Sequence, residues 1–347
     1  MMKSINHIFL TGATGFIGSH VADFFCSKKE KICCLTRRNS NLDYLRTLPL
    51  NIVYGDITDR DQLRGALKGA KTVIHIAGMV RDWGEYEEFY RANVEGTLNV
   101  LKAGYENNIR QFIITGSISS YGEEDCARMK SENSPYNSHY PYFLDKYFPC
   151  KMNFYRDTKA LTTQEAILFA QEHGLNLTII EPTWVYGERE FHSGFYEYIH
   201  AAKSGIQFMP GSFKNKFHVI YAKDLAEAYY LAYLKKPPGI QRIIVGNESS
   251  EKMERIHTIF CRESGVRRPR ALPRWLTYPS AFLLEWLYTI FSSKTPPLLT
   301  RGRVNMFYDN LEYATSKARD MLLFTNRHTI EEGIHNTVQW YKQQKLI

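Results

Sequence analysis

The sequence lacks the features that mark a membrane-spanning, metal-binding or nucleic-acid-binding chain. No stretch reaches the roughly 18 uninterrupted apolar residues that a membrane span requires, and the nearest approach, 275–291, contains Pro279 and Glu285. The six cysteines include no C-x-x-C pair, so we expect reduced, mostly buried thiols and no metal site. No run of lysines and arginines is long enough to favour a nucleic acid as partner.

The first ten residues are too polar, and their apolar run is too short, for a secretory signal. Together with reduced thiols, this predicts a cytoplasmic protein. The composition of 44% hydrophobic and 23% charged residues is that of a folded globular chain and argues against a disordered, collagen-like or coiled-coil protein. The formal net charge of +8 suits an anionic small molecule or a membrane surface.

Short apolar runs alternate with helical patterns through the first half of the chain. The runs are 7–10, 31–35, 51–54, 72–77, 111–115 and 177–181, and the clearest helical patterns are 19–27, 86–107 and 160–173. A strand that is buried on both faces reads as a continuous apolar run. The alternation therefore predicts an α/β fold, a doubly wound parallel sheet with helices on both faces.

A glycine pattern lies between the first apolar run and the first helix. Gly12 is placed to make the tight turn, Gly15 to let the backbone approach a pyrophosphate, and Gly18 to let helix and strand pack closely. The N-terminus of the helix would supply N–H donors to the phosphates. Strand, glycine turn and helix in this order predict a dinucleotide site of the Rossmann type.

The spacing G-x-x-G-x-x-G resembles that of the extended short-chain dehydrogenase/reductase superfamily, the NAD-dependent epimerases and dehydratases. The likeness covers roughly residues 5–235, with Glu181 in place of that family's usual arginine. Further matching motifs follow in the family's order: Gly55-Asp56-Ile57, His75-Ile76-Ala77-Gly78, Asn93-Val94-Glu95-Gly96-Thr97, Thr115-Gly116-Ser117-Ile118-Ser119-Ser120-Tyr121-Gly122 and Pro182-Thr183-Trp184-Val185-Tyr186-Gly187.

The resemblance implies a Rossmann-type dinucleotide-binding domain, residues 1–182 with a returning segment at about 214–247. A smaller C-terminal α/β substrate lobe would comprise 183–213 and 248–347. Besides the three glycines, the resemblance assigns cofactor contacts to Phe16, Ile17, Asp56, Ile57, Ala77, Gly78, Asn93, Tyr155, Lys159 and Thr183.

The end of the second apolar run bears on the choice of cofactor. An NAD site places an acidic residue there, on the ribose 2′-hydroxyl, whereas this chain has Arg37 and Arg38 and no acid before Asp43. Guanidinium groups bind a 2′-phosphate through their planar fork, and a carboxylate would repel it. We therefore expect NADP, with NAD as the alternative.

The catalytic tyrosine has to be chosen among five Y-x-x-x-K pairs. The chemistry needs both side chains on one helix face, which i,i+4 spacing provides. Tyr147/Lys151 encloses a proline, Tyr142/Lys146 lies in a loop-like region, and Tyr313/Lys317 and Tyr341/Lys345 lie beyond the cofactor half. Only Tyr155/Lys159 begins a long helical run that leads into the sixth strand.

The roles of these residues follow from the chemistry and from the family. Tyr155 is the expected general acid/base, and since a free tyrosine titrates near pH 10, Lys159 is expected to stabilise its phenolate. Ser117 is the expected donor to the substrate oxygen, with Ser119 and Ser120 as rivals. The resemblance also places Lys159 on the hydroxyls of the nicotinamide ribose.

The stretch between Ser117 and Tyr155 is about a dozen residues longer than we expect for the family, and it is rich in Tyr, Phe and Pro. Two interpretations stay open, an aromatic wall over the substrate and a surface insertion that packs on itself. The serine strand lacks the Thr-Asp-Glu of sugar-nucleotide dehydratases, and the arginine of many epimerases is missing near Lys216. The region 272–304 looks more like the 3β-hydroxysteroid dehydrogenase and dihydroflavonol reductase branch.

We therefore expect an NADP-dependent oxidoreductase that moves hydride between the cofactor and an apolar hydroxy or keto compound, such as a steroid, flavonoid or lipid. Trp184, Tyr186, Phe282 and Trp286 are the expected substrate contacts. The alternatives are an NAD-dependent nucleotide-sugar epimerase and a non-catalytic dinucleotide sensor. A peripheral membrane contact through 275–291, flanked by basic residues, and a homodimer stay open.

Overall fold

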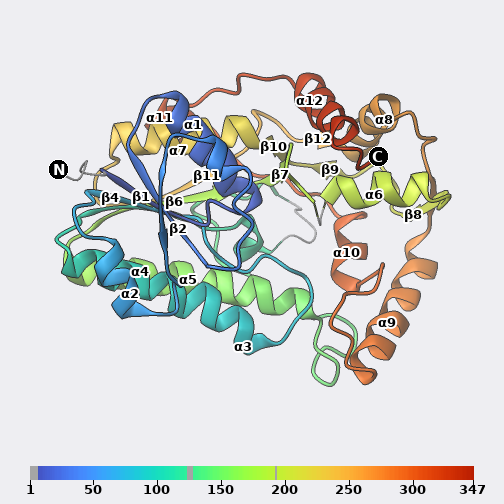
Figure 1. Ribbon diagram of the computed structural model, residues 1–347. Coiled ribbons are helices and arrows are strands. Elements are labelled where there is room, and N and C mark those ends of the chain that lie inside the picture. The colour runs from blue at the N-terminus through green and yellow to red at the C-terminus, as the bar shows by residue number, and fades with distance from the viewer. Residues whose placement is uncertain (1–6, 123–127, 192–193) are drawn as a thin grey trace.

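The computed structural model describes residues 7–122, 128–191 and 194–347. Its centre is a parallel sheet of seven strands in the order β11-β6-β5-β4-β1-β2-β3 (Figure 1). The strands are β1 (Ile8–Thr11), β2 (Ile32–Thr36), β3 (Asn51–Tyr54), β4 (Thr72–His75), β5 (Gln111–Thr115), β6 (Asn176–Pro182) and β11 (Ile240–Val245). The expected doubly wound α/β fold is confirmed.

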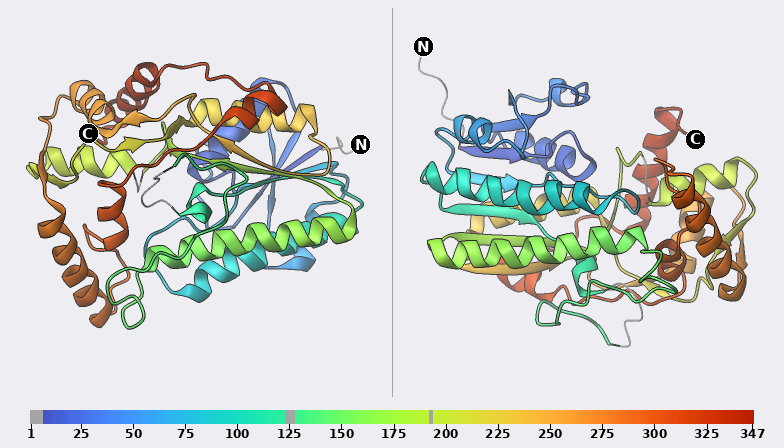
Figure 2. Two further views of the ribbon diagram at one scale, coloured as in Figure 1. Left: turned by 180° about the vertical axis from the view of Figure 1, so that it is seen from behind. Right: turned by 90° about the horizontal axis from the view of Figure 1, so that it is seen from below.

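Helices cover both faces of this sheet (Figures 1 and 2). One face carries α1 (Phe16–Ser27), α7 (Ala222–Lys235) and α11 (Ser316–Leu322), and the other carries α2 (Arg60–Ala66), α4 (Gly96–Glu106) and α5 (Lys151–His173). Each face has its own apolar core, built from the strands' alternating side chains and the inward faces of these helices. The helical stretch expected over 86–107 is a continuous helical run made of α3 (Tyr86–Phe89), a π-helical segment η2 (Tyr90–Glu95) and α4.

The second lobe lies at the carboxyl ends of the strands and is held together by an aromatic core. Its sheets are short pairs, β10 with β7, β12 with β9 and β13 with β8. The elements are β7 (Trp184–Tyr186), α6 (Gly194–Lys203), β8 (Phe208–Pro210), β9 (Lys216–Phe217), β10 (Val219–Tyr221), β12 (Glu251–Lys252), α8 (Met253–Ser264), β13 (Arg270–Leu272), α9 (Arg274–Ile290), α10 (Arg301–Met306) and α12 (Ile330–Gln343).

Two late segments of the chain complete the apolar core on the side of the sheet that carries α1 and α7. The strand β11 pairs with β6 in parallel, and α11 contributes Ala318 and Leu322 to the core beneath α1 and α7. This short helix lies within 248–347, the range that the sequence assigned to the substrate lobe. The chain therefore crosses between the two parts several times.

The aromatic insertion before α5 packs on α9. Phe282 of α9 lies 5.3 Å from Phe143 and 6.2 Å from Phe148, measured between ring centroids. The insertion packs on itself through Tyr140 and Tyr142, whose ring centroids lie 4.7 Å apart, and also rests on a helix of the second lobe more than a hundred residues later. The five cysteines within the described ranges are free and buried, and Cys126 lies outside those ranges.

Candidate active site

The glycine turn after β1 has the geometry of a phosphate-binding turn. Gly12 has φ +80°, and a Cβ there would lie 2.5 Å from the backbone nitrogen of Ala77. A Cβ on Gly18 would lie 2.0 Å from the Gly12 carbonyl oxygen. Only glycine fits at these two positions. The turn leads directly into α1 with Gly15 as its N-cap, so the first N–H groups of the helix are available to an anion.

The residues expected around the adenosine lie at the ends of β2 and β3. Arg37 and Arg38 follow β2 directly and are exposed, and the Arg38 guanidinium lies 5.4 Å from the centre of the Tyr54 ring. Asp56, after β3, accepts hydrogen bonds of 2.9 Å from the backbone N–H and the hydroxyl of Thr58. The two arginines are therefore exposed at the end of β2, and their contact with a 2′-phosphate stays a prediction.

Asn93 joins the end of β4 to the catalytic helix. Its side-chain oxygen accepts from the backbone N–H of Met79 at 2.7 Å, and its amide donates to the Met79 carbonyl and to the Thr158 hydroxyl at 3.2 Å each. It lies in the π-helical segment η2, an irregularity that frequently marks functional sites. In this arrangement Asn93 holds the loop after β4, which includes Gly78, against α5, and its contact with the cofactor stays a prediction.

The three predicted catalytic side chains converge from two elements. The Tyr155 hydroxyl, on α5, donates to Ser117 Oγ at 3.3 Å. Lys159, one turn further along α5, donates to the Thr115 carbonyl at the end of β5 at 2.5 Å. Ser119 Oγ lies 2.6 Å from Ser117 Oγ, so this rival is a hydrogen-bond partner of Ser117. The helix α5 and the end of β5 thus bring the expected proton donor Tyr155 together with Lys159 and Ser117.

The lysine of this group is buried, and its charge depends on its neighbours. Burial lowers the pKa of Lys159 to about 8, and the Glu181 carboxylate acts in the opposite direction by stabilising the ammonium. Burial and the charge of Lys159 lower the pKa of His75 to about 3, so this histidine is neutral. It lies between the hydroxyls of Thr11 (2.7 Å) and Thr97 (2.9 Å), fixing the end of β4.

Glu181, which replaces the family's usual arginine, is fully buried behind the serine turn. Its carboxylate accepts a 2.5 Å hydrogen bond from Tyr121 and longer ones, each 3.4 Å, from Tyr136 and Arg242. Burial raises the pKa of Glu181 to about 7, against the lowering effects of Arg242 and Tyr121. The sequence showed the substitution but not that Arg242, on β11, supplies the missing positive charge.

The expected substrate residues after β6 are mostly buried. Trp184 packs on Phe217 with ring centroids 5.4 Å apart. Tyr186 lies in the aromatic core of the second lobe, against Tyr221. The Thr183 hydroxyl is buried and has no hydrogen-bond partner among the described residues. An unsatisfied buried hydroxyl at a position assigned to cofactor binding fits a ligand group as its partner.

The predicted contacts on α9 lie further out. Phe282 is occupied by the aromatic insertion, and Trp286 is half-buried. Nearer the strand ends, Arg303 of α10 bonds to Asp82 in the loop after β4 and to Glu197 of α6 at 3.1 Å. Sequence reasoning missed this link, because no local pattern connects residues so far apart.

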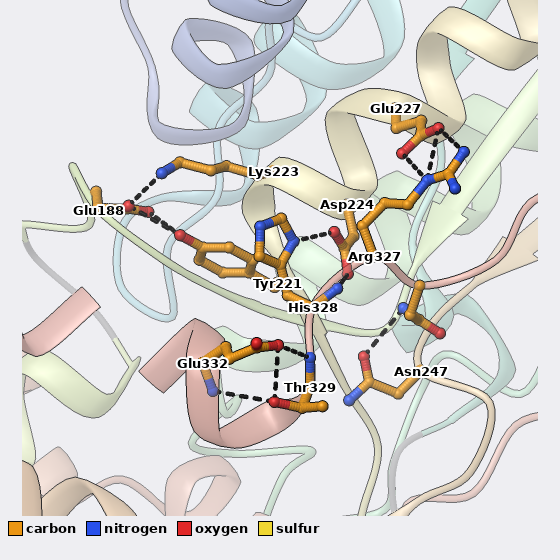
Figure 3. Close-up of polar contacts among 11 residues, drawn as sticks. Glu188, Tyr221, Lys223, Asp224, Glu227, Asn247, Arg327, His328, Thr329 and Glu332 are labelled. Atoms are coloured by element: carbon orange, nitrogen blue, oxygen red, sulfur yellow. Dashed lines mark hydrogen bonds and ion pairs between the residues drawn. The ribbon is translucent and has the colours of Figure 1, made fainter. Parts of the chain in front are cut away.

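A polar network joins the connection after β7 to α7 and the segment before α12 (Figure 3). Glu188 accepts from Tyr221 at 2.8 Å and pairs with Lys223 at 2.7 Å, and Asp224 contacts His328 at 2.6 Å. The backbone carbonyl of Glu188 also bonds to His20 of α1 at 2.7 Å. The network holds the second lobe against the helix that follows the glycine turn.

Residues 8–246 match the model of the NAD dependent epimerase/dehydratase family, and the chain belongs to this family. It is similar to the sterol demethylase protein B of Methylococcus capsulatus, with 25% identity over 97% of this chain and 99% of that protein. It is also similar to the 3 beta-hydroxysteroid dehydrogenase type 7 of Mus musculus, with 25% identity over 95% and 94% of the two chains.

A solved structure, MoeE5 in complex with UDP-glucose and NAD, matches with a TM-score of 0.75 over 97% of this chain and 99% of that chain, at 20% identity. At this identity the match establishes the fold alone. The expected resemblance to the extended short-chain class is confirmed. The chain is a nicotinamide-cofactor-dependent enzyme of this class, and the glycine turn, α1 and the Thr183 hydroxyl form a site that fits such a cofactor.

Proposed function

We propose that this protein is an NADP-dependent oxidoreductase that transfers hydride between the cofactor and the carbinol or carbonyl carbon of an apolar hydroxy or keto compound. The observation that carries the proposal is the convergence of Ser117, Tyr155 and Lys159, with Tyr155 Oη 3.3 Å from Ser117 Oγ. A proton donor, an orienting hydroxyl and a buried cation are the groups that carbonyl reduction requires.

When bound, the nicotinamide ring donates or accepts the hydride. In the reducing direction Ser117 donates a hydrogen bond to the carbonyl oxygen, and Tyr155 gives that oxygen its proton. In the oxidising direction Tyr155 takes the alcohol proton. The ammonium of Lys159 favours the phenolate by opposing its charge, and Glu181 opposes the loss of that ammonium in a buried site.

An apolar substrate is supported by the second lobe and by the relatives. The lobe is built around an aromatic core, and ligand pockets are lined mainly by apolar side chains with a few placed polar groups. Two of the relatives are named for sterol or steroid chemistry. Trp184, Tyr186, Phe282 and Trp286 stay the proposed substrate side chains.

The alternative is an NAD-dependent nucleotide-sugar epimerase, an activity for which the matched family is named. The two differ in how they treat the cofactor, because an epimerase oxidises its substrate only transiently and keeps NAD bound. A sensor without activity would have no need of a proton donor such as Tyr155.

The test of the proposal is a turnover screen. Steroid ketones, flavonoids, long-chain ketones and nucleotide sugars are each offered with NADPH, and the loss of its absorbance is followed. We expect consumption of NADPH with at least one apolar ketone. Purification with tightly retained NAD, together with interconversion of a nucleotide sugar without net change in cofactor, would establish the epimerase instead.

The preference for NADP rests on Arg37 and Arg38, which are exposed at the end of β2. We expect the double variant Arg37→Ala, Arg38→Ala to bind NADPH about ten- to hundredfold more weakly, since the loss of one hydrogen bond to a charged group costs roughly 1.5–3 kcal/mol. Affinity for NADH should hardly change, because NADH has no 2′-phosphate. A fluorescence titration measures both affinities.

Arg46→Ala is the matched control, since Arg46 is an exposed arginine of the same connection, nine residues after Arg37. It should leave both affinities unchanged. An equal loss for NADPH and NADH in the double variant, or a preference of the unaltered protein for NADH, would contradict the assignment.

A further inference from the structure

One face of α9 is apolar and open to solvent. Trp275, Pro279, Leu283 and Ile290 recur at intervals of four or seven residues and therefore share one side of the helix. Trp275 is 76% exposed, and Leu283 and Ile290 are each 53% exposed. The opposite side, with Thr277, Ala281 and Glu285, is buried. Figure 1 and the left view of Figure 2 place α9 at the outer edge of the second lobe.

The aromatic insertion extends this surface. Phe143 is 58% exposed, Leu144 41% and Tyr147 70%, although the loop that carries them lies against α9 through the Phe143–Phe282 contact. Figure 1 shows the loop beside the lower end of α9. We call Phe143, Leu144, Tyr147, Trp275, Leu276, Pro279, Leu283, Ile290 and Phe291 the α9 surface.

A buried arginine fixes the two parts of the α9 surface relative to each other. The guanidinium of Arg301 is 1% exposed and pairs with Glu285 of α9. It also donates to the carbonyls of Phe143 and Phe148, the latter at 2.7 Å. The exposed aromatic loop is therefore held in place by a buried cation, which lowers the entropy lost when the loop binds a partner.

The charges next to the α9 surface are mainly basic, and Asp145 of the loop is largely buried and paired with His139 at 3.1 Å. Between 265 and 299 the only acidic residue is Glu285, which is buried against Arg301. Arg267, Arg270 and Lys294 flank the helix, are exposed, and make no ion pair with any residue that the structure describes. On the loop, Lys146 is exposed beside Tyr147.

We propose that the α9 surface is a docking site for an anionic lipid bilayer, with the helix lying in the plane of the interface. Exposed Trp and Tyr side chains at the level of the headgroups, apolar side chains below them and cations toward anionic lipid are the arrangement of interfacial helices. Scattered exposed leucines elsewhere, such as Leu168 and Leu234, are ordinary, whereas the α9 surface gathers nine exposed apolar or aromatic side chains on one helix and on the loop packed against it.

The proposal concerns adsorption, not insertion across the membrane. No helix in the described ranges meets the length and hydropathy that a crossing requires. It is independent of the proposed substrate, because it rests on the composition and exposure of the surface and not on Tyr155. Docking would nevertheless bring the second lobe to the source of apolar compounds.

The test is co-sedimentation of the purified full chain with vesicles of phosphatidylcholine, with and without phosphatidylglycerol. We expect binding to the anionic vesicles that weakens as salt is raised. The double variant Trp275→Ser, Phe291→Ser should lower the partition coefficient about a hundredfold, since each large apolar side chain is worth roughly tenfold. The triple variant Arg267→Gln, Arg270→Gln, Lys294→Gln should lose about fivefold per charge on anionic vesicles alone.

The control is Leu168→Ser, Leu234→Ser, which removes two exposed apolar side chains, 58% and 50% exposed, from α5 and α7 and should bind as the unaltered protein does. Thermal unfolding and NADPH titration check that every variant is folded. Absence of binding to anionic vesicles, or equal binding by the Trp275 and control variants, would overturn the proposal. A concentration-dependent dimer that the Trp275 variant dissociates, without vesicle binding, would show the surface to be an interface between two copies.

Discussion

Replacing Tyr155 with phenylalanine should reduce turnover by a factor of about 10² to 10⁴, the range that general acid–base catalysis contributes. The ring stays in α5, so the loss is confined to the hydroxyl that donates to Ser117. Cofactor affinity should survive, because the glycine turn and the end of β2 are untouched. Initial rates on the substrate found in the screen, and an NADPH titration, measure the two effects separately.

Lys159→Ala should lower both turnover and the affinity for NADPH. Lys159 is expected to stabilise the phenolate of Tyr155 and to hold the nicotinamide ribose. Tyr147→Phe is the control, because Tyr147 belongs to another Y-x-x-x-K pair and is 70% exposed. An active Tyr155→Phe enzyme, or an inactive Tyr147→Phe enzyme, would mean that the wrong pair was chosen.

Glu285→Ala should lower the free energy of unfolding by about 3–5 kcal/mol, the cost of removing one partner from a buried ion pair. The variant leaves the guanidinium of Arg301 buried without its countercharge. Because Arg301 also holds the carbonyls of Phe143 and Phe148, the aromatic insertion should loosen as well. Denaturant titration measures the stability, and proteolysis within residues 139–150 measures the loosening.

Glu106→Ala is the comparison, since it breaks the exposed pair with Arg60, which should cost less than about 1 kcal/mol. The double variant Glu285→Leu, Arg301→Met should recover most of the loss, as uncharged replacements of buried pairs often do. Equal losses in the free energy of unfolding for Glu285→Ala and Glu106→Ala would show that the buried ion pair contributes no more to stability than the exposed one.

The parts of the site that could be predicted are those that depend on short stretches of sequence with fixed spacing. The glycine turn requires its residues at fixed spacing, and the collision that a Cβ on Gly18 would make explains why. The preference for Tyr155 over its four rivals rests on the need for an uninterrupted helical run. The structure places Tyr155 on α5, and its catalytic role stays a prediction. The structure starts α5 at Lys151, immediately after Pro149 and Cys150, so the proline argument against Tyr147 identified the helix start.

The parts that could not be predicted depend on partners far apart in the chain. In the sequence, Glu285 is a charged residue that interrupts an apolar segment. Its partner Arg301 lies 16 residues later, and the pairing is visible only in the folded structure. The π-helical turn around Asn93 lies within a continuous helical run, and the apolar pattern of that run does not distinguish it from an α-helix. The burial of Tyr186 likewise follows from β10, which pairs with β7.

The position of β11 and α11 has a consequence for how the protein is made. Ile243 and Val245 of β11 and Ala318 and Leu322 of α11 belong to the same core as β1 and α1. A ribosome delivers β11 and α11 after the six other strands of the sheet, so the nascent dinucleotide domain is incomplete at the edge of β6 and beside α7 until they emerge. Such unpaired strands and apolar faces favour association between unfinished chains. The last contacts of this domain therefore form only after α11 has left the exit tunnel.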